Sequence, residues 1–203
     1  MRTFLLSPLA LCVMLIATPS MAQTVYSNGP TNGNTDAWTI NFGFVVSDTF
    51  VVNNSHNSAT ITGFTMADWL FPGDTLISAD LSITSAENGG TSFFEQTENF
   101  TQSACSANTF GFNVCLEDTA FSGPTLENGT YWINVQNAVV TTGDPIFWDE
   151  NSGPSSASQT TVGSVPSESF TVRGSFESST GTVPEPSSNM LFGSGILGFA
   201  SLR

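Results

Sequence analysis

Residues 75–85 read TLISADLSITS, and apolar and polar side chains alternate along them. A period of two places successive side chains on opposite faces of an extended strand. The stretch therefore predicts a half-buried strand of an antiparallel sheet, with one face on a core and the other in water. The apolar face consists of Ile77, Ala79, Leu81 and Ile83, and the polar face of Ser78, Asp80, Ser82 and Thr84.

The same alternation occurs on both sides of this strand. Turn sequences separate the runs, as in Pro72-Gly73-Asp74 and Asn88-Gly89-Gly90. Many short strands between turns predict an all-β fold, an antiparallel two-sheet β-sandwich of jelly-roll-like type. One predicted strand has Trp38, Ile40, Phe42, Phe44 and Val46 on one face, and a late strand has Phe170, Val172 and Phe176; further candidates are residues 49–52, 59–66, 91–100, 108–115, 130–140 and 145–148.

Composition limits the function classes. The chain has 203 residues with 17 acidic and 3 basic side chains, for a net charge of −14. Binding to a phosphate backbone depends on Lys and Arg, so a nucleic-acid partner is not expected. With 39% hydrophobic residues, most of the chain should fold. We expect one sandwich domain at residues 38–177, after a flexible segment at 23–37 and before a linker at 178–186.

The N-terminus has the pattern of a secretory signal peptide. Arg2 precedes an apolar run from Phe4 to Ala17, which is shorter than the roughly 20 residues that span a bilayer. The small residues Ser20 and Ala22 then form a signal-peptidase site. Cleavage after Ala22 would remove residues 1–22 and export the rest.

The C-terminus carries a second signal. Pro184-Glu185-Pro186 precedes the apolar segment Met190–Leu202, and the chain stops at Arg203. This arrangement resembles the PEP-CTERM sorting signal of exported proteins in Gram-negative bacteria that make exopolysaccharide. The resemblance implies that residues 187–203 form a sorting tail with a short hydrophobic helix, associated transiently with the inner membrane. It also implies that an exosortase recognises Pro184-Glu185-Pro186 and sends the protein to the cell surface or extracellular matrix.

Two cysteines remain after removal of the signal peptide. Cys105 and Cys115 are ten positions apart. An even number of cysteines in an exported chain favours a disulfide. A metal-binding or redox role would require cysteines closer together in the sequence, or more Cys and His residues. A structural disulfide is therefore predicted.

Catalytic motifs are sparse. His56 is the single histidine, and the chain has no Gly-x-Ser-x-Gly sequence. A glycoside hydrolase would need two carboxyl groups roughly 5 to 10 Å apart, and the sequence does not single out such a pair. We therefore predict a non-enzymatic protein of the cell surface or extracellular matrix, with a glycoside hydrolase as an alternative.

A carbohydrate-binding module is the other alternative. If Tyr131, Ile133 and Val135 face the core, Trp132, Asn134 and Gln136 share the opposite face. A flat ring beside amide groups suits a sugar, and exopolysaccharide would be the partner. Trp148 and Asp149 offer a second such cluster. The competing interpretation places both tryptophans under loops or in the core.

No cofactor is expected, although structural calcium is an alternative. Two stretches are rich in oxygen ligands, but neither has the acidic partner that a recognisable calcium loop needs. Ordinary turn residues are the simpler interpretation. The stretches contain Asp149, Asn151 and Gly153 in one case, and Asn28, Asn32, Asn34 and Asp36 in the other.

Overall fold

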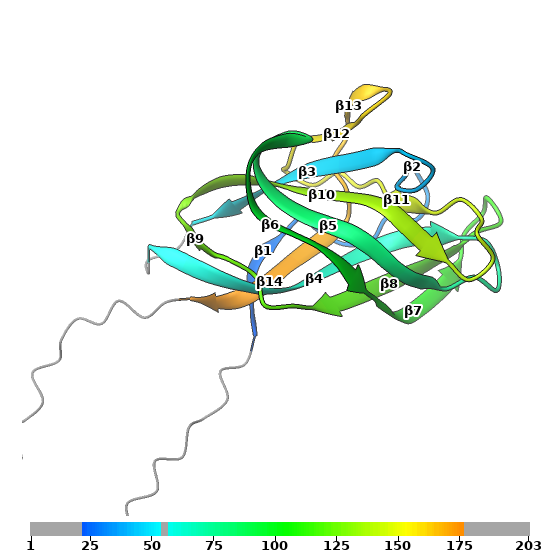
Figure 1. Cartoon of the computed structure of the whole chain (residues 1–203). Helices are drawn as coiled ribbons and strands as arrows, with labels where there is room; N and C mark the ends of the chain where they lie inside the picture. The colour runs from blue at the N-terminus through cyan, green and yellow to red at the C-terminus, as the bar shows by residue number, and fades with distance from the viewer. Residues whose placement is uncertain (1–21, 54–56, 177–203) are drawn as a thin grey trace, which may run out of the picture.

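The structure, a computed structural model, describes residues 22–53 and 57–176. These residues form two antiparallel sheets (Figure 1), which confirms the prediction of an all-β two-sheet fold. The described part contains no helix long and apolar enough to cross a membrane. Its strands are β1 (Gln23–Ser27), β2 (Ala37–Thr39), β3 (Val45–Val52), β4 (Ser58–Leu70), β5 (Leu76–Ala86), β6 (Gly89–Asn99), β7 (Thr101–Ala107), β8 (Asn113–Ala120), β9 (Thr125–Glu127), β10 (Gly129–Val140), β11 (Phe147–Asp149), β12 (Ala157–Gln159), β13 (Gly163–Val165) and β14 (Phe170–Phe176).

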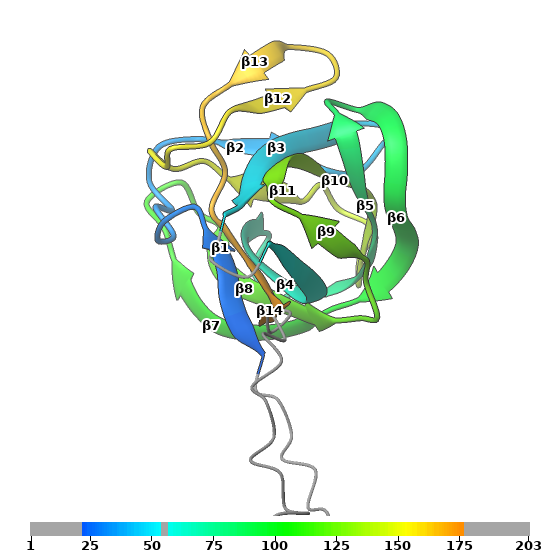
Figure 2. The same ribbon diagram turned by 90° about the vertical axis from the view of Figure 1, so that its left-hand side faces the viewer.

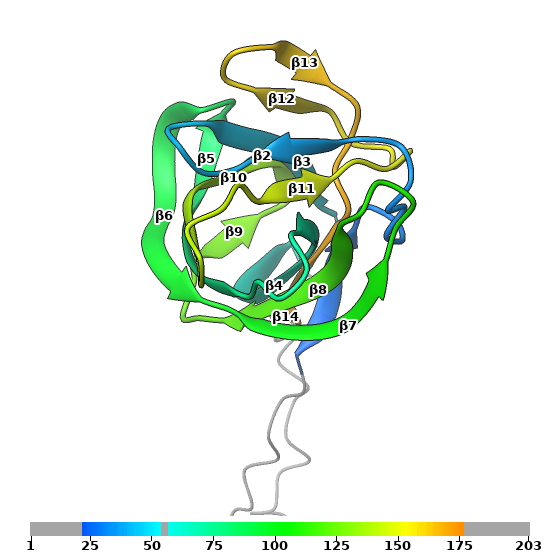
Figure 3. The ribbon, with the colours of Figure 1, turned by 90° about the vertical axis from the view of Figure 1, so that its right-hand side faces the viewer.

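Strand β4 organises the larger sheet. This eight-stranded sheet runs in the order β1-β14-β4-β11-β2, and β8 and β9 also pair with β4, while β7 pairs with β8. The six-stranded sheet has the order β13-β12-β3-β10-β5-β6. Figures 2 and 3, which view the domain from opposite sides, show the two sheets facing each other with β12 and β13 projecting at the top.

The core fills the space between the sheets. Phe50, Leu81 and Ile133 come from the six-stranded sheet, and each is fully buried. From the eight-stranded sheet, Phe64 meets Trp148 edge to face with ring centroids 5.8 Å apart. Such contacts between large rings stabilise the core beyond the area they bury.

Strand β5 confirms the strand predicted at residues 75–85. At its start, however, the alternation of buried and exposed side chains is shifted by one residue from the prediction. Ala79, Leu81 and Ile83 are buried as predicted, whereas Ile77 is 46% exposed and Leu76 is buried instead. The pairing of β5 with β10 shifts register between Val139 and Val140. Such a shift reverses the faces of the side chains beyond it.

The prediction of one strand from Trp38 to Val46 was wrong. Strand β2 ends at Thr39 in the eight-stranded sheet, and β3 begins at Val45 in the six-stranded sheet. Between them the chain turns, with positive φ at Phe42 (56°) and Gly43 (87°). Phe42 is therefore 64% exposed rather than in the core. The apolar alternation of the sequence continues through the residues where the chain crosses from one sheet to the other. Periodicity alone does not reveal such a crossover.

The prediction of a flexible segment at residues 23–37 was also wrong at both of its ends. Strand β1 pairs with β14, with Gln23 opposite Gly174, and the segment ends at the start of β2. Val25 and Tyr26 pack against the core. The Gly- and Asn-rich composition belongs to the loop between these strands. Residues 1–21 of the predicted signal peptide, His56 and residues 177–203, with the predicted linker, motif and tail, lie outside the described residues.

Candidate functional site

Strand β10 presents a polar row on the outer face of the six-stranded sheet. Ile133 and Val135 are fully buried in the core. Trp132, Asn134 and Gln136 alternate with them and therefore lie on the opposite face. This is the face that the sequence indicated for a carbohydrate.

Neighbouring strands extend this row into a grid of polar side chains. Strand β5 lies between β10 and β6. Each outward residue of β10 therefore lies beside an outward residue of β5, which in turn lies beside one of β6. Adjacent strands are about 4.8 Å apart, and the grid is therefore about 10 Å wide. Its three rows are Trp132, Thr84 and Ser92; Asn134, Ser82 and Glu95; and Gln136, Asp80 and Thr97.

A cleft of about 240 Å³ lies over this grid. The turn between β5 and β6 forms one wall, and positive φ at Asn88 (49°) and Gly90 (81°) gives this turn its shape. The cleft is lined by amide, hydroxyl and carboxyl groups, which suit the hydroxyls of a sugar. Its lining consists of Val45, Ser82, Thr84, Asn88, Gly89, Gly90, Ser92, Glu95, Asn134 and Gln136.

Asn134 forms the floor of the cleft. Its Nδ2 donates to the hydroxyls of Ser82 (3.1 Å) and Thr84 (3.0 Å). Its Oδ1 accepts from the hydroxyl of Ser47 (2.6 Å) and from the backbone N–H of Asn88 (3.3 Å). The side chain is 3% exposed and its polar atoms are occupied. Asn134 therefore positions the cleft walls rather than offering its amide to a ligand.

The groups open to a ligand are Trp132, Gln136 and Glu95. Trp132 and Gln136 are half-buried, and Glu95 is exposed. Among the described residues, the side chains of Gln136 and Glu95 have no hydrogen-bond partner. Trp132 is not among the residues that line the cleft, but it stands one row from Asn134 and pairs with Thr84, which does line it. The sequence predicted a turn at residues 88–90, but it did not indicate that this turn or Glu95 belongs to the site.

The second predicted glycan cluster, Trp148 and Asp149, is wrong because both residues are fully buried. Trp148 lies in the core, and its Nε1 donates to the backbone oxygen of Ser169 (3.0 Å). Asp149 accepts hydrogen bonds from the backbone N–H groups of Asn32 (2.7 Å) and Gly33 (2.8 Å). A sugar reaches neither side chain.

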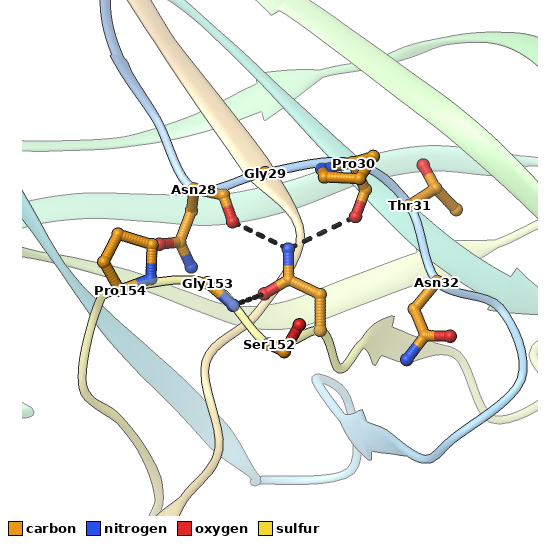
Figure 4. Close-up of a pocket in the computed structure, with 9 residues that line it drawn as sticks. Asn28, Gly29, Pro30, Thr31, Asn32, Ser152, Gly153 and Pro154 are labelled. Atoms are coloured by element: carbon orange, nitrogen blue, oxygen red, sulfur yellow. Dashed lines mark hydrogen bonds between the residues drawn. The ribbon is translucent and has the colours of Figure 1, made fainter.

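The two stretches predicted to offer calcium ligands lie side by side. Asn28 to Asn32 and Asn151 to Pro154 line a cavity of about 460 Å³ (Figure 4). Asn151 joins the two stretches, because its Nδ2 donates to the backbone oxygens of Asn28 (2.8 Å) and Pro30 (3.3 Å). Their proximity was not predicted, since more than a hundred residues separate them.

Several side chains of these stretches already form hydrogen bonds within the turns. Asn151 Oδ1 accepts from the N–H of Gly153 (2.9 Å), and Asp36 Oδ1 accepts from the N–H of Ala37 (2.9 Å). Asn34 Nδ2 donates to the backbone oxygen of Asn32 (2.8 Å). These are contacts of turn residues. Within the described residues, no group of three or more His, Cys, Asp or Glu side chains is arranged to hold a metal ion. Calcium binding stays a prediction.

Besides Asp149, four further carboxyl groups are fully buried, on Asp48, Asp68, Glu117 and Glu168. Burial raises the pKa of Asp48 to about 6 and that of Glu117 to about 7. Burial, followed by the neighbouring carboxylates, raises the pKa values of Asp68 and Glu168 well above the usual range. Within the described part of the chain, both oxygens of Asp68 and of Glu168 lack a hydrogen-bond partner. These two side chains are therefore most stable in the protonated form.

A group of aromatic rings lies at the end of the eight-stranded sheet where β4 finishes. Trp69 stacks on Phe110 with centroids 5.4 Å apart, and Phe71 meets Phe112 at 4.9 Å. Phe110 is 57% exposed. Nearby, Cys105 and Cys115 form the predicted disulfide between β7 and β8.

Comparison with known families identifies only the tail. Residues 182–203 match the PEP-CTERM protein-sorting motif. No curated protein and no solved structure matches the chain. The match confirms the resemblance noted at Pro184, Glu185 and Pro186, and it supports an exported protein that an exosortase processes at the cell envelope. The match covers the tail and none of the folded domain.

Proposed function

We propose that the domain is a non-catalytic module of the cell surface or extracellular matrix that binds a carbohydrate chain in the cleft of the six-stranded sheet. The observation that carries the proposal is the position of Trp132 one row from Asn134, next to a cleft lined by polar groups. An aromatic face can stack on the apolar face of a sugar ring, while nearby acceptors and donors bind its hydroxyls. Gln136 and Glu95 provide those groups, and Asn134 holds the strands and turn in place.

The placement of the acidic side chains supports a role without catalysis. A glycoside hydrolase needs two carboxyl groups that flank a substrate bond. Asp48, Asp68, Glu117 and Glu168 have the most strongly raised carboxyl pKa values and are fully buried. Among the described residues, Glu95 is the one carboxyl group that lines the cleft. We propose that the exported protein binds its glycan and leaves it intact.

The proposed cellular location follows from the sorting tail. A PEP-CTERM protein leaves the cytoplasm, and we propose the envelope of a Gram-negative bacterium, with transient inner-membrane association, as the place of processing. Exopolysaccharide is then the abundant carbohydrate that the domain meets. Signal peptidase and exosortase are the proposed processing partners.

Co-sedimentation of the secreted protein with the host's own exopolysaccharide tests the proposal. We expect the wild type to sediment with the polymer and Trp132→Ala to lose most of this binding. Phe110→Ala is the matched control, since it removes an exposed aromatic ring from the turn between β7 and β8, at the end of the other sheet. Running both with calcium and with a chelator tests the calcium prediction in the same experiment.

Each outcome has a defined meaning. Loss of binding in Trp132→Ala but not in Phe110→Ala supports the cleft. Loss only in Phe110→Ala would move the site to the aromatic end of the eight-stranded sheet. An absence of binding by the wild type would refute the glycan proposal and leave a displayed structural domain. Release of shortened sugar chains would instead show a glycoside hydrolase.

A further inference from the structure

Positive charge is almost absent from the folded domain. The chain has no lysine and three arginines, at positions 2, 173 and 203. Arg173 is therefore the single Lys or Arg side chain among the described residues. It lies on β14 in the eight-stranded sheet, and its Nη2 pairs with Asp118 Oδ1 at 2.7 Å. Within the part of the chain that the structure describes, the cleft on the other sheet thus has no cation among its lining residues.

Negative charge, by contrast, lies at the cleft itself. Glu95 is exposed, lines the cleft and occupies the same row as Ser82 and Asn134. Asp80 stands in the next row, where its carboxylate accepts from Asn137 Nδ2 (2.8 Å) and from the hydroxyl of Thr97. The carboxylate of Glu95 has no such partner within the described residues. It remains available to accept hydrogen bonds from a ligand.

We infer that the cleft takes a neutral glycan and rejects chains that carry carboxylate or sulfate groups. The inference rests on the proposed function and adds its ligand class. Two hydroxyls of a neutral sugar can donate to the oxygens of Glu95, which are strong acceptors. A uronate at the same place would put two carboxylates together, and no lining residue offers a compensating cation. Glu95 is thus the residue that discriminates by charge.

The test compares one polymer in two charge states. The host exopolysaccharide is converted to a neutral form by reduction of any carboxyl groups, and to an acidic form by oxidation of its primary hydroxyls. Binding of the full secreted protein to each form is measured at low and high salt. We expect the neutral form to bind at least about tenfold more tightly at low salt, with a smaller difference at high salt.

Two charge-neutralising variants separate a local effect from the overall charge. Glu95→Gln should raise affinity for the acidic form about tenfold, because one unit charge a few ångströms from the ligand is removed. Glu127→Gln, on β9 of the other sheet, changes the net charge equally and should change this affinity less than twofold. Circular dichroism shows whether both variants keep the fold.

The outcomes separate this inference from the proposed function. Tighter binding of the acidic form, or equal effects of the two variants, would overturn the inference while leaving a carbohydrate-binding domain. Binding of neither form would overturn both. Preference for the neutral form together with a selective effect of Glu95→Gln supports both.

Discussion

The buried carboxyl groups predict that this protein becomes less stable as the pH rises. Asp48 has a pKa of about 6 in the folded protein against 3.8 as an ordinary side chain. Below about pH 4 both states are protonated. Between pH 4 and 6 the unfolded chain releases the proton while the folded protein keeps it, so unfolding becomes more favourable as the pH increases.

The size of the effect follows from the pKa difference. A difference of about two pH units for Asp48 corresponds to about 3 kcal/mol, at about 1.4 kcal/mol per unit. Glu117, with a pKa of about 7, acts in the same direction over a window that extends to higher pH. Typical domains unfold with about 5–15 kcal/mol, so a loss of this size is readily measured.

Urea unfolding of the secreted protein, followed by tryptophan fluorescence from pH 4 to 8, measures this loss. We expect the free energy of unfolding to fall by about 3 kcal/mol or more over this range. Glu168→Gln removes a buried carboxyl group whose oxygens have no partner among the described residues, so it should flatten the curve. Glu127→Gln, an exposed carboxyl group, makes the same change in charge and should leave the slope unchanged.

The opposite pH dependence would refute this reasoning. A free energy of unfolding that is constant or rises from pH 4 to 8 would mean that the buried groups are not protonated in the folded state. An equal flattening by Glu168→Gln and Glu127→Gln would assign the effect to general repulsion among the acidic residues instead.

Three further predictions concern stability at constant pH, each measured by urea unfolding. Reducing the Cys105–Cys115 disulfide, which closes a short loop, should lower the free energy of unfolding by roughly 2–3 kcal/mol; an unchanged value would contradict a structural role. Gly174→Ala should destabilise by about 1–3 kcal/mol, because a Cβ there would lie 2.2 Å from a backbone oxygen of β4. Trp148→Ala should lower stability by about 3–5 kcal/mol, whereas Trp132→Ala should have a much smaller effect; equal losses would place both rings in the core.

Local patterns predicted the strands and the face of β10, because alternation is a property of neighbouring residues. The sequence therefore indicated Trp132, Asn134 and Gln136 together. It could not show that Glu95 stands in the same row as Asn134. That relation depends on the pairing of β5 with both β6 and β10, which is long-range information.

The wrong predictions have the same origin, because they too depend on long-range information. Trp148 and Asp149 have the residue types of a binding site, and burial by β4 and by the loop after β1 removes them from the surface. Phe42 continues an apolar alternation, but the chain crosses between sheets there. The composition of residues 23–37 also concealed strand β1. Only Gln23–Ser27 pairs with β14, and the loop that follows it is rich in Gly and Asn.

The position of β14 between two other strands has a mechanical consequence. This strand lies between β1 and β4, and it is antiparallel to both. In a domain held by its C-terminal tail, drag from flowing liquid or an attached polymer would pull on β14 along its length from Phe176. Hydrogen bonds on both sides of the strand would then resist in shear together, rather than opening one after another as they would at the edge of a sheet.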